Sequence, residues 1–77
     1  MSERITQKAL SLRVGNVNRR LQGTGLSVCD QGRNGYTALD EYRDGQCQRT
    51  IMAGTKREVA EFLHAMMVGI DMSRQGR

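Results

Sequence analysis

The chain has few aromatic residues: its 77 residues include no tryptophan, one phenylalanine (Phe62) and two tyrosines (Tyr36 and Tyr42). A chain of this length forms one domain and buries only roughly 60–65% of its unfolded surface. The core therefore has to be built from methionine and a few aliphatic residues. We expect a single domain over residues 1–77, and a deep substrate cleft is not expected in so small a body.

Cysteines and long apolar runs are also scarce. The two cysteines, Cys29 and Cys47, are too few for a disulfide scaffold, and no apolar run approaches the length of a membrane span. The first residues, Met1-Ser2-Glu3-Arg4, lack the apolar segment of a secretory signal. We therefore expect a cytoplasmic protein with reduced thiols and no membrane partner.

Residue types that carry catalysis or bind metals form no recognisable cluster. His64 is the only histidine, and its place on the polar side of a C-terminal helix predicts an exposed side chain. Asp40 and Glu41 point to opposite faces of one predicted strand, so they cannot act as a paired acid and base. The cysteines fall on two strands that flank a third, roughly 10 Å apart, without zinc-type spacing. We expect no enzymatic activity, no metal and no cofactor.

The clearest pattern predicts a helix over residues 55–72. Thr55 and Glu58 have the spacing of a capping box, in which each side chain caps the other residue's backbone N–H. Behind them, apolar residues recur at positions 59, 62, 63, 66, 67 and 70, which is one face of a helix. We expect residues 73–77 to form a frayed tail.

Residues 4–21 fit a helix, with a strand over residues 8–14 as the alternative. The apolar positions with helical spacing are Leu10, Val14, Val17 and Leu21. Apolar and polar residues also alternate over residues 10–14, as in a strand, but the helical period holds over a longer span. The helix leaves Ile5 and Leu12 away from the main apolar face, where they either wrap the edge of the core or form an exposed patch.

Residues 26–52 predict a three-stranded antiparallel meander, with strands over 26–30, 36–43 and 46–52. The pairs Asn34-Gly35 and Asp44-Gly45 between the strands are favoured in tight hairpin turns. The fold class is therefore α+β: an N-terminal helix, the meander, and a C-terminal helix packed on one face of the sheet.

A two-residue loop at Asp44-Gly45 would fix the pairing of the second and third strands. The predicted pairs are Arg43 with Gln46, Tyr42 with Cys47, Asp40 with Arg49 as an ion pair, and Ala38 with Ile51. One face of the sheet then carries Tyr36, Ala38, Tyr42, Cys47 and Ile51, and the other carries Leu39 and Met52.

The length of the first loop decides which face is buried. A three-residue loop places Leu26 and Val28 on the tyrosine face, whereas a loop of two or four residues places them with Leu39 and Met52. Both possibilities stay open at this point, and we favour the tyrosine face as the buried one.

The charge balance indicates an anionic partner. Twelve Lys and Arg against eight Asp and Glu give +4, and ten of the twelve cations are Arg, which suits planar recognition of phosphate. Residues 1–21 carry five cations and one acid, or +4, and a further cation pair opens the C-terminal helix. The predicted nucleic-acid contacts are Arg13, Arg19, Arg20, Arg33, Lys56 and Arg57.

The alternative function is a protein-interaction module that binds a second copy or a host or phage protein. Its predicted contacts are Ile5 and Leu12, together with Val68 on the polar side of the C-terminal helix.

Two resemblances accompany these patterns. Gly54, Lys56 and Arg57 before the last helix, in an α-β-β-β-α order, resemble double-stranded RNA-binding domains, which implies phosphate contacts from that helix start. The ending Thr55-Lys56-Arg57-Glu58, with Leu63, Ala65, Met66, Gly69 and Ile70 behind it, resembles small uncharacterised proteins of tailed phages and prophages. The second resemblance implies a small accessory protein in a bacterial host cell, with no named activity.

Overall fold

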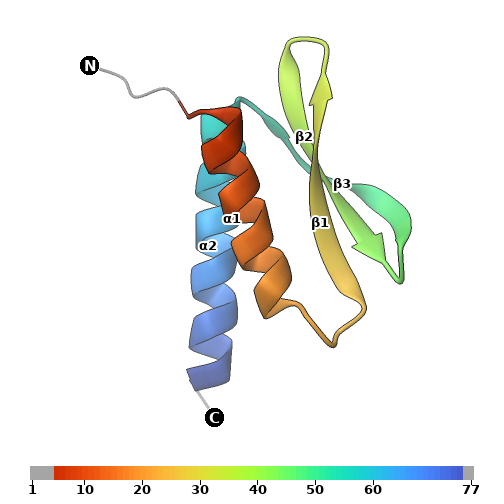
Figure 1. Ribbon diagram of the computed structural model, residues 1–77, viewed down its shortest axis with the longest axis vertical. Helices are drawn as coiled ribbons and strands as arrows, with labels where there is room; N and C mark the ends of the chain where they lie inside the picture. The colour runs from red at the N-terminus through yellow and green to blue at the C-terminus, as the bar shows by residue number, and fades with distance from the viewer. Residues whose placement is uncertain (1–4, 76–77) are drawn as a thin grey trace.

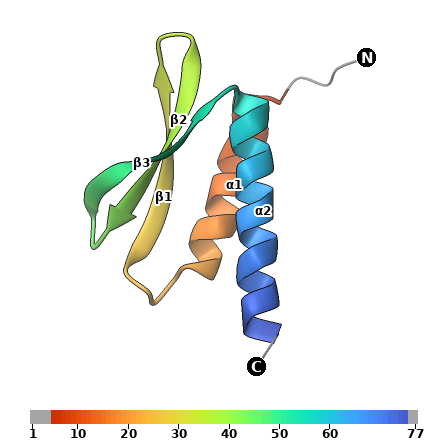
Figure 2. The same ribbon diagram turned by 180° about the vertical axis from the view of Figure 1, so that it is seen from behind.

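The computed structural model describes residues 5–75, which fold in the order α-β-β-β-α (Figure 1). The elements are α1 (Gln7–Arg20), β1 (Leu26–Arg33), β2 (Tyr36–Arg43), β3 (Gln46–Gly54) and α2 (Lys56–Gln75). The strands form an antiparallel sheet in the order β1-β2-β3. Both helices lie on one side of the sheet and run in the same direction (Figures 1 and 2). The predicted α+β class and topology are confirmed.

Helix α1 follows the apolar periodicity that favoured a helix over a strand. Leu10, Val14 and Val17 are buried along one side of it. Thr6 caps the first turn, because its Oγ1 accepts a hydrogen bond from the backbone N–H of Ala9 at 3.1 Å. The helix therefore begins at Gln7, three residues after the predicted start, which lies outside the described residues.

Helix α2 begins with the predicted capping box. The Thr55 hydroxyl accepts from the Glu58 N–H at 3.1 Å, and the Glu58 carboxylate accepts from the Thr55 N–H at 2.8 Å. Gly54 leaves room for that carboxylate, since a Cβ at this position would lie 2.5 Å from Glu58 Oε1. A side chain at position 54 would therefore displace the Glu58 carboxylate from its capping position.

The last turn of α2 is longer than predicted. The helix continues to Gln75, so the expected tail is wrong for residues 73–75, and residues 76–77 lie outside the described part of the chain. Contacts to α1 explain the extra turn. Arg20 pairs with Asp71 at 2.9 Å, and the Arg74 guanidinium donates to the Arg20 carbonyl. These contacts hold the C-terminal ends of the two helices together.

The first hairpin has a two-residue loop, Asn34-Gly35, with Arg33 paired to Tyr36. Gly35 has a φ of +79°, which glycine adopts without steric cost. This loop places Val28 on the same face as Leu39, and the helices cover that face. The preferred tyrosine face is therefore wrong as the buried one, because a change of one residue in loop length moves every side chain of β1 to the other face.

The second hairpin has the predicted turn but a different register further along. Tyr42 pairs with Cys47 as expected, whereas Asp40 pairs with Thr50 and not with Arg49. Two bulges insert one extra residue each into β3. One inserted residue is Ile51, which packs against the core and does not pair with Ala38 as predicted.

The bulges also change the ion pairs of the sheet. The predicted pair between Asp40 and Arg49 does not form, because Arg49 lies opposite Glu41 and contacts its carboxylate at 2.8 Å. Asp40 instead contacts Arg33 of β1, at 3.3 Å. The shifted register of β3 thus brings Arg49 to the face that carries Glu41, whereas the regular β1–β2 pairing places Arg33 on the face that carries Asp40.

The core lies between the helices and the covered face of the sheet and is small and almost entirely aliphatic. Its buried members are Leu10, Val14, Val17, Val28, Leu39, Val59, Ala60 and Leu63. Phe62, Met66 and Met67 are half-buried around it. Because the core is so small, polar contacts between the helices and strands also have to fix their relative positions.

One such contact closes an edge of the sheet. The side-chain amide of Asn18 in α1 donates to the Val28 carbonyl at 2.9 Å, and its oxygen accepts from the Val28 N–H at 2.8 Å. Asn18 therefore pairs with β1 as a neighbouring strand would. The contact satisfies two backbone groups of an edge strand and fixes α1 against the sheet.

Candidate nucleic-acid interface

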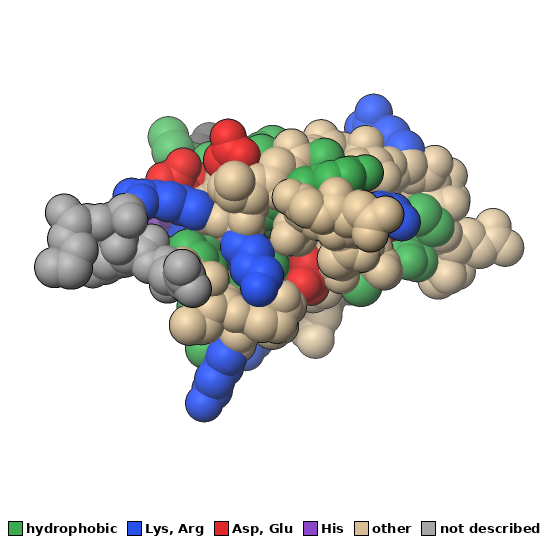
Figure 3. All heavy atoms as spheres, turned by 90° about the horizontal axis from the view of Figure 1, so that it is seen from above, with side chains coloured by type: hydrophobic (Ala, Val, Ile, Leu, Met, Phe, Trp, Pro, Cys, Tyr) green, Lys and Arg blue, Asp and Glu red, His purple; other side chains and the backbone are tan. Residues whose placement is uncertain are grey.

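A groove lies at the end of the molecule where both helices begin. It has a volume of about 630 Å³ and is lined by Ile5, Gln7, Gly32, Arg33, Gly35, Tyr36, Thr37, Thr55, Lys56 and Arg57. Figure 3 shows this end from above, with Lys and Arg side chains at several places around it. The groove is formed by three segments far apart in sequence: the start of α1, the β1–β2 turn and the start of α2. We call it the basic groove.

The lining of the basic groove has three cations and no acidic residue. Arg33 is the last residue of β1, and Lys56 and Arg57 are the first two residues of α2. Both helices point their N-termini towards this end, and a helix N-terminus carries a partial positive charge. The cations of the lining and the helix dipoles both favour an anion in the basic groove.

Two of the three cations form ion pairs with acidic residues that are not part of the groove lining. Arg57 contacts Glu61 at 3.5 Å, one turn further along α2, and both side chains are largely exposed. Arg33 contacts the buried Asp40. Within residues 5–75, Lys56 takes part in no ion pair. The Arg57–Glu61 pair is exposed and therefore weak, so Arg57 stays able to bind a second anion, whereas the buried Asp40 carboxylate holds Arg33 more firmly.

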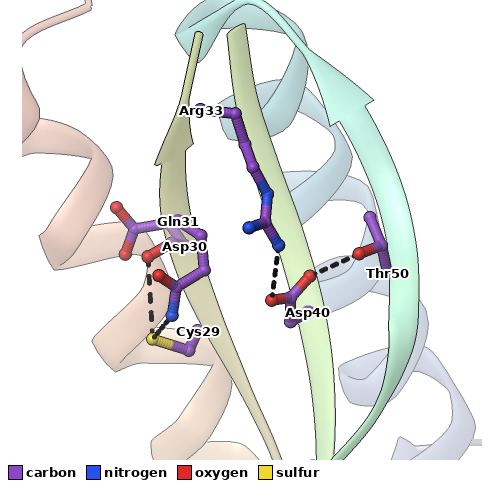
Figure 4. Close-up of polar contacts among 6 residues, drawn as sticks. All are labelled: Cys29, Asp30, Gln31, Arg33, Asp40 and Thr50. Carbon is purple, nitrogen blue, oxygen red and sulfur yellow. Dashed lines mark hydrogen bonds and ion pairs between the residues drawn. The ribbon is translucent and has the colours of Figure 1, made fainter.

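Asp40 fixes the direction of Arg33. The Asp40 residue is only 4% exposed, and its two oxygens accept hydrogen bonds from Thr50 at 2.6 Å and from Arg33 at 3.3 Å. Figure 4 shows Arg33 extending along the sheet towards Asp40, with Thr50 on the other side. This network lies on the face of the sheet opposite the helices and joins all three strands.

The same open face carries Cys29, Gln31 and Tyr42. The Cys29 thiol accepts from the Gln31 amide at 3.5 Å and donates to the Asp30 carbonyl at 3.6 Å (Figure 4). Partial burial raises the pKa of the Tyr42 phenol above 10.0. Coulombic interactions with Cys47, Cys29 and Asp40 raise the Tyr42 pKa further, and a hydrogen bond with Gln31 lowers it.

The structure also shows the state of the cysteines and of His64. Cys29 and Cys47 are both free thiols. Among residues 5–75, no three His, Cys, Asp or Glu side chains lie close enough to hold a metal ion. His64 is exposed, as predicted.

The other three predicted nucleic-acid contacts lie outside the basic groove. Arg13 donates to the Ala60 carbonyl at 3.2 Å and so joins α1 to α2. Arg20 forms an ion pair with Asp71. Arg19 is exposed near the end of α1, at the opposite end of the molecule. The structure therefore brings together Arg33, Lys56 and Arg57 and places Arg19 and Arg20 at the other end of α1. Arg13 lines a small adjacent cavity with Arg57.

The structure also places the predicted protein-partner contacts on different surfaces. Ile5 packs against the core and lines the basic groove, whereas Leu12 is 63% exposed on the outer side of α1. Val68 is exposed on α2, and Met72, four residues later, is 66% exposed beside it. Sequence reasoning missed Met72, although its spacing from Val68 could have shown that the two share one side of the helix.

Sequence reasoning also missed Tyr36 as a site residue. Tyr36 was expected on the buried face, but it is 46% exposed and lines the basic groove. The Asn34-Gly35 turn was the available signal, because a residue directly after a hairpin turn lies at the end of the sheet.

None of the helices within residues 5–75 is long and apolar enough to span a membrane. Comparison with known proteins found no matching family model, no similar curated protein and no similar solved structure.

Proposed function

We propose that the protein is a small, non-enzymatic nucleic-acid-binding module and that the basic groove is its contact surface. The single observation that carries the proposal is the convergence of Arg33, Lys56 and Arg57 around one concave surface whose lining has no acidic residue. The resemblance to phage and prophage proteins supports an accessory role in the cytoplasm of a bacterial host.

The three cations suit a phosphate backbone for different reasons. Arg57 can offer two parallel N–H donors to one phosphate, Lys56 acts as a compact point charge, and Arg33 can offer the N–H donors that its contact with Asp40 leaves free. The capping box takes the N–H groups of Thr55 and Glu58, so the side chains of the lining have to supply the phosphate contacts. About three phosphate contacts predict weak, non-specific binding, with dissociation constants on the order of 10⁻⁴ to 10⁻⁶ M.

The test compares two double variants of equal charge. Lys56→Ala with Arg57→Ala removes two cations from the basic groove, and Arg19→Ala with Arg43→Ala removes two exposed arginines from the opposite end. Each double variant lowers the net charge from +4 to +2 (4 − 2). Fluorescence anisotropy with labelled oligonucleotides at low salt measures the affinity of each.

We expect the groove variant to lose about tenfold or more in affinity, because two of three phosphate contacts are gone. The control variant should lose far less, since only the long-range field changes. Equal losses in both variants would show that net charge and not the groove determines binding, and the proposal would then be wrong.

A second candidate function, a protein-interaction module, is favoured by one observation. Val68 and Met72 form an exposed apolar strip on the outer side of α2, where a polar surface is usual. Light scattering over a range of concentrations tests self-association. A mass that rises with concentration, and that Met72→Ser returns to the monomer value, would support this candidate over the first.

A further inference from the structure

We infer that the basic groove takes a single-stranded nucleic acid, with one base stacked on Tyr36 and the adjoining phosphates on Lys56 and Arg57. The inference rests on the proposed function and deepens it, because it names the class of nucleic acid. It follows from the placement of Tyr36, the size of the groove and the shape of the β1–β2 turn.

Tyr36 is placed as a stacking surface would be. It is 46% exposed, although large aromatic side chains are usually well buried, and it lies in the lining of the groove. It also lies directly across the hairpin from Arg33. A cationic channel beside an exposed aromatic ring is the combination that proteins use to bind single strands without sequence preference.

The size of the groove fits a nucleotide. Its volume of about 630 Å³ falls within the range of pockets that hold small ligands, roughly 300–1,000 Å³. Ile5 and Tyr36 supply apolar surface for a base, and the three cations supply the phosphate contacts. Neither a phosphate ion nor a bare sugar–phosphate chain would use the apolar part of this lining.

The β1–β2 turn disfavours a duplex. In a duplex the bases are stacked inside and their faces cannot reach Tyr36. A duplex would have to be contacted by an element that enters one of its grooves, yet the turn projects only Asn34 and Gly35 beyond the paired residues Arg33 and Tyr36. A single strand presents its bases and phosphates together, which matches the lining of the basic groove.

The test uses three labelled probes of about twelve nucleotides, within the usual site size for single-strand binders. They are a single-stranded oligonucleotide, its duplex, and an abasic strand that keeps only the sugar–phosphate chain. Each is measured by fluorescence anisotropy against the wild type, Tyr36→Ala and Tyr36→Phe. Tyr42→Phe is a further control, because Tyr42 lies on the same sheet face but outside the groove lining.

We expect the wild type to bind the single strand about five- to 100-fold more tightly than the abasic strand, which is the usual contribution of one stacked base. Tyr36→Ala should remove this difference, and Tyr36→Phe and Tyr42→Phe should keep it. Circular dichroism confirms that each variant is folded.

Two results would overturn the inference. One is a duplex affinity equal to or higher than that of the single strand. The other is a Tyr36→Ala variant that keeps the preference for the single strand over the abasic strand. Both leave the proposed function standing if Lys56→Ala with Arg57→Ala still weakens binding to all three probes. If that double variant binds all three like the wild type, the proposed function itself fails.

Discussion

Replacing Asn18 with Ala should destabilise the fold far more than a typical polar substitution on a helix does. The Asn18 amide makes two hydrogen bonds to the backbone of Val28, at 2.8 and 2.9 Å. Each is worth about 1 kcal/mol net, and a backbone group left unpaired near the core adds about 1 kcal/mol or more. Val28 is only 4% exposed, so water replaces these bonds poorly. The expected loss is about 2–4 kcal/mol in the free energy of unfolding.

This loss is large for a chain of 77 residues, whose total stability is expected at about 4–12 kcal/mol. It should lower the melting temperature by roughly 10–25 °C. Urea denaturation followed by circular dichroism measures the free energy, and a thermal scan measures the shift in melting temperature.

Asn16→Ala is the matched control. Asn16 lies in the same helix but on the side that faces α2, where it lines a small cavity with Leu63 and His64. Replacing Asn with Ala raises the helix propensity equally at both positions. The difference in the free energy of unfolding between the two variants therefore measures the contact of Asn18 with β1. A difference below about 0.5 kcal/mol would refute the role of Asn18 in closing the edge of the sheet.

Three further predictions concern other parts of the structure. Asp40→Ala should lower the free energy of unfolding by about 1–3 kcal/mol in urea denaturation, because it removes a buried acceptor and leaves the Arg33 guanidinium unpaired. Thr55→Ala should cost about 1 kcal/mol in the same assay through loss of the capping box, whereas Glu58→Gln, which keeps a side-chain oxygen acceptor, should cost less. The Tyr42 phenol should ionise above pH 10.0 in an ultraviolet absorbance titration, and Tyr42→Phe should remove that component of the titration. Because the Tyr42 pKa is raised in the folded state, its contribution to stability is present below the pKa of the unfolded chain and is lost as the pH rises through the pKa of the folded protein.

Elements with a local signal were predictable from the sequence. The capping box at Thr55 and Glu58, the helical stripe of α1 and the two turns each depend on residues close together in the chain. The fold class followed from these signals alone.

The buried face of the sheet was not predictable, because both faces carry few apolar residues and the decision depended on one residue of loop length. The bulges in β3 were also not predictable from the sequence. The segment from Gln48 to Thr50 is polar throughout, so it has no apolar alternation that an inserted residue would interrupt.

The basic groove was predictable only in its parts. Lys56 and Arg57 were identified from the start of a helix, and Arg33 only as one of the cations of a basic chain. Their convergence depends on the direction of α2 relative to the first hairpin, which no local pattern encodes. Asn18 gave no signal either, because a polar residue in a helix is ordinarily exposed and its partner, Val28, is ten positions away.

The most direct test of the account maps the binding surface on the protein itself. Backbone amide chemical shifts are recorded by NMR while a single-stranded oligonucleotide is added at low salt. The account predicts that the largest changes fall on residues 32, 33, 35–37 and 55–57, which line the basic groove. Changes centred on residues 19–25 or 43–47, at the opposite end of the molecule, would contradict it.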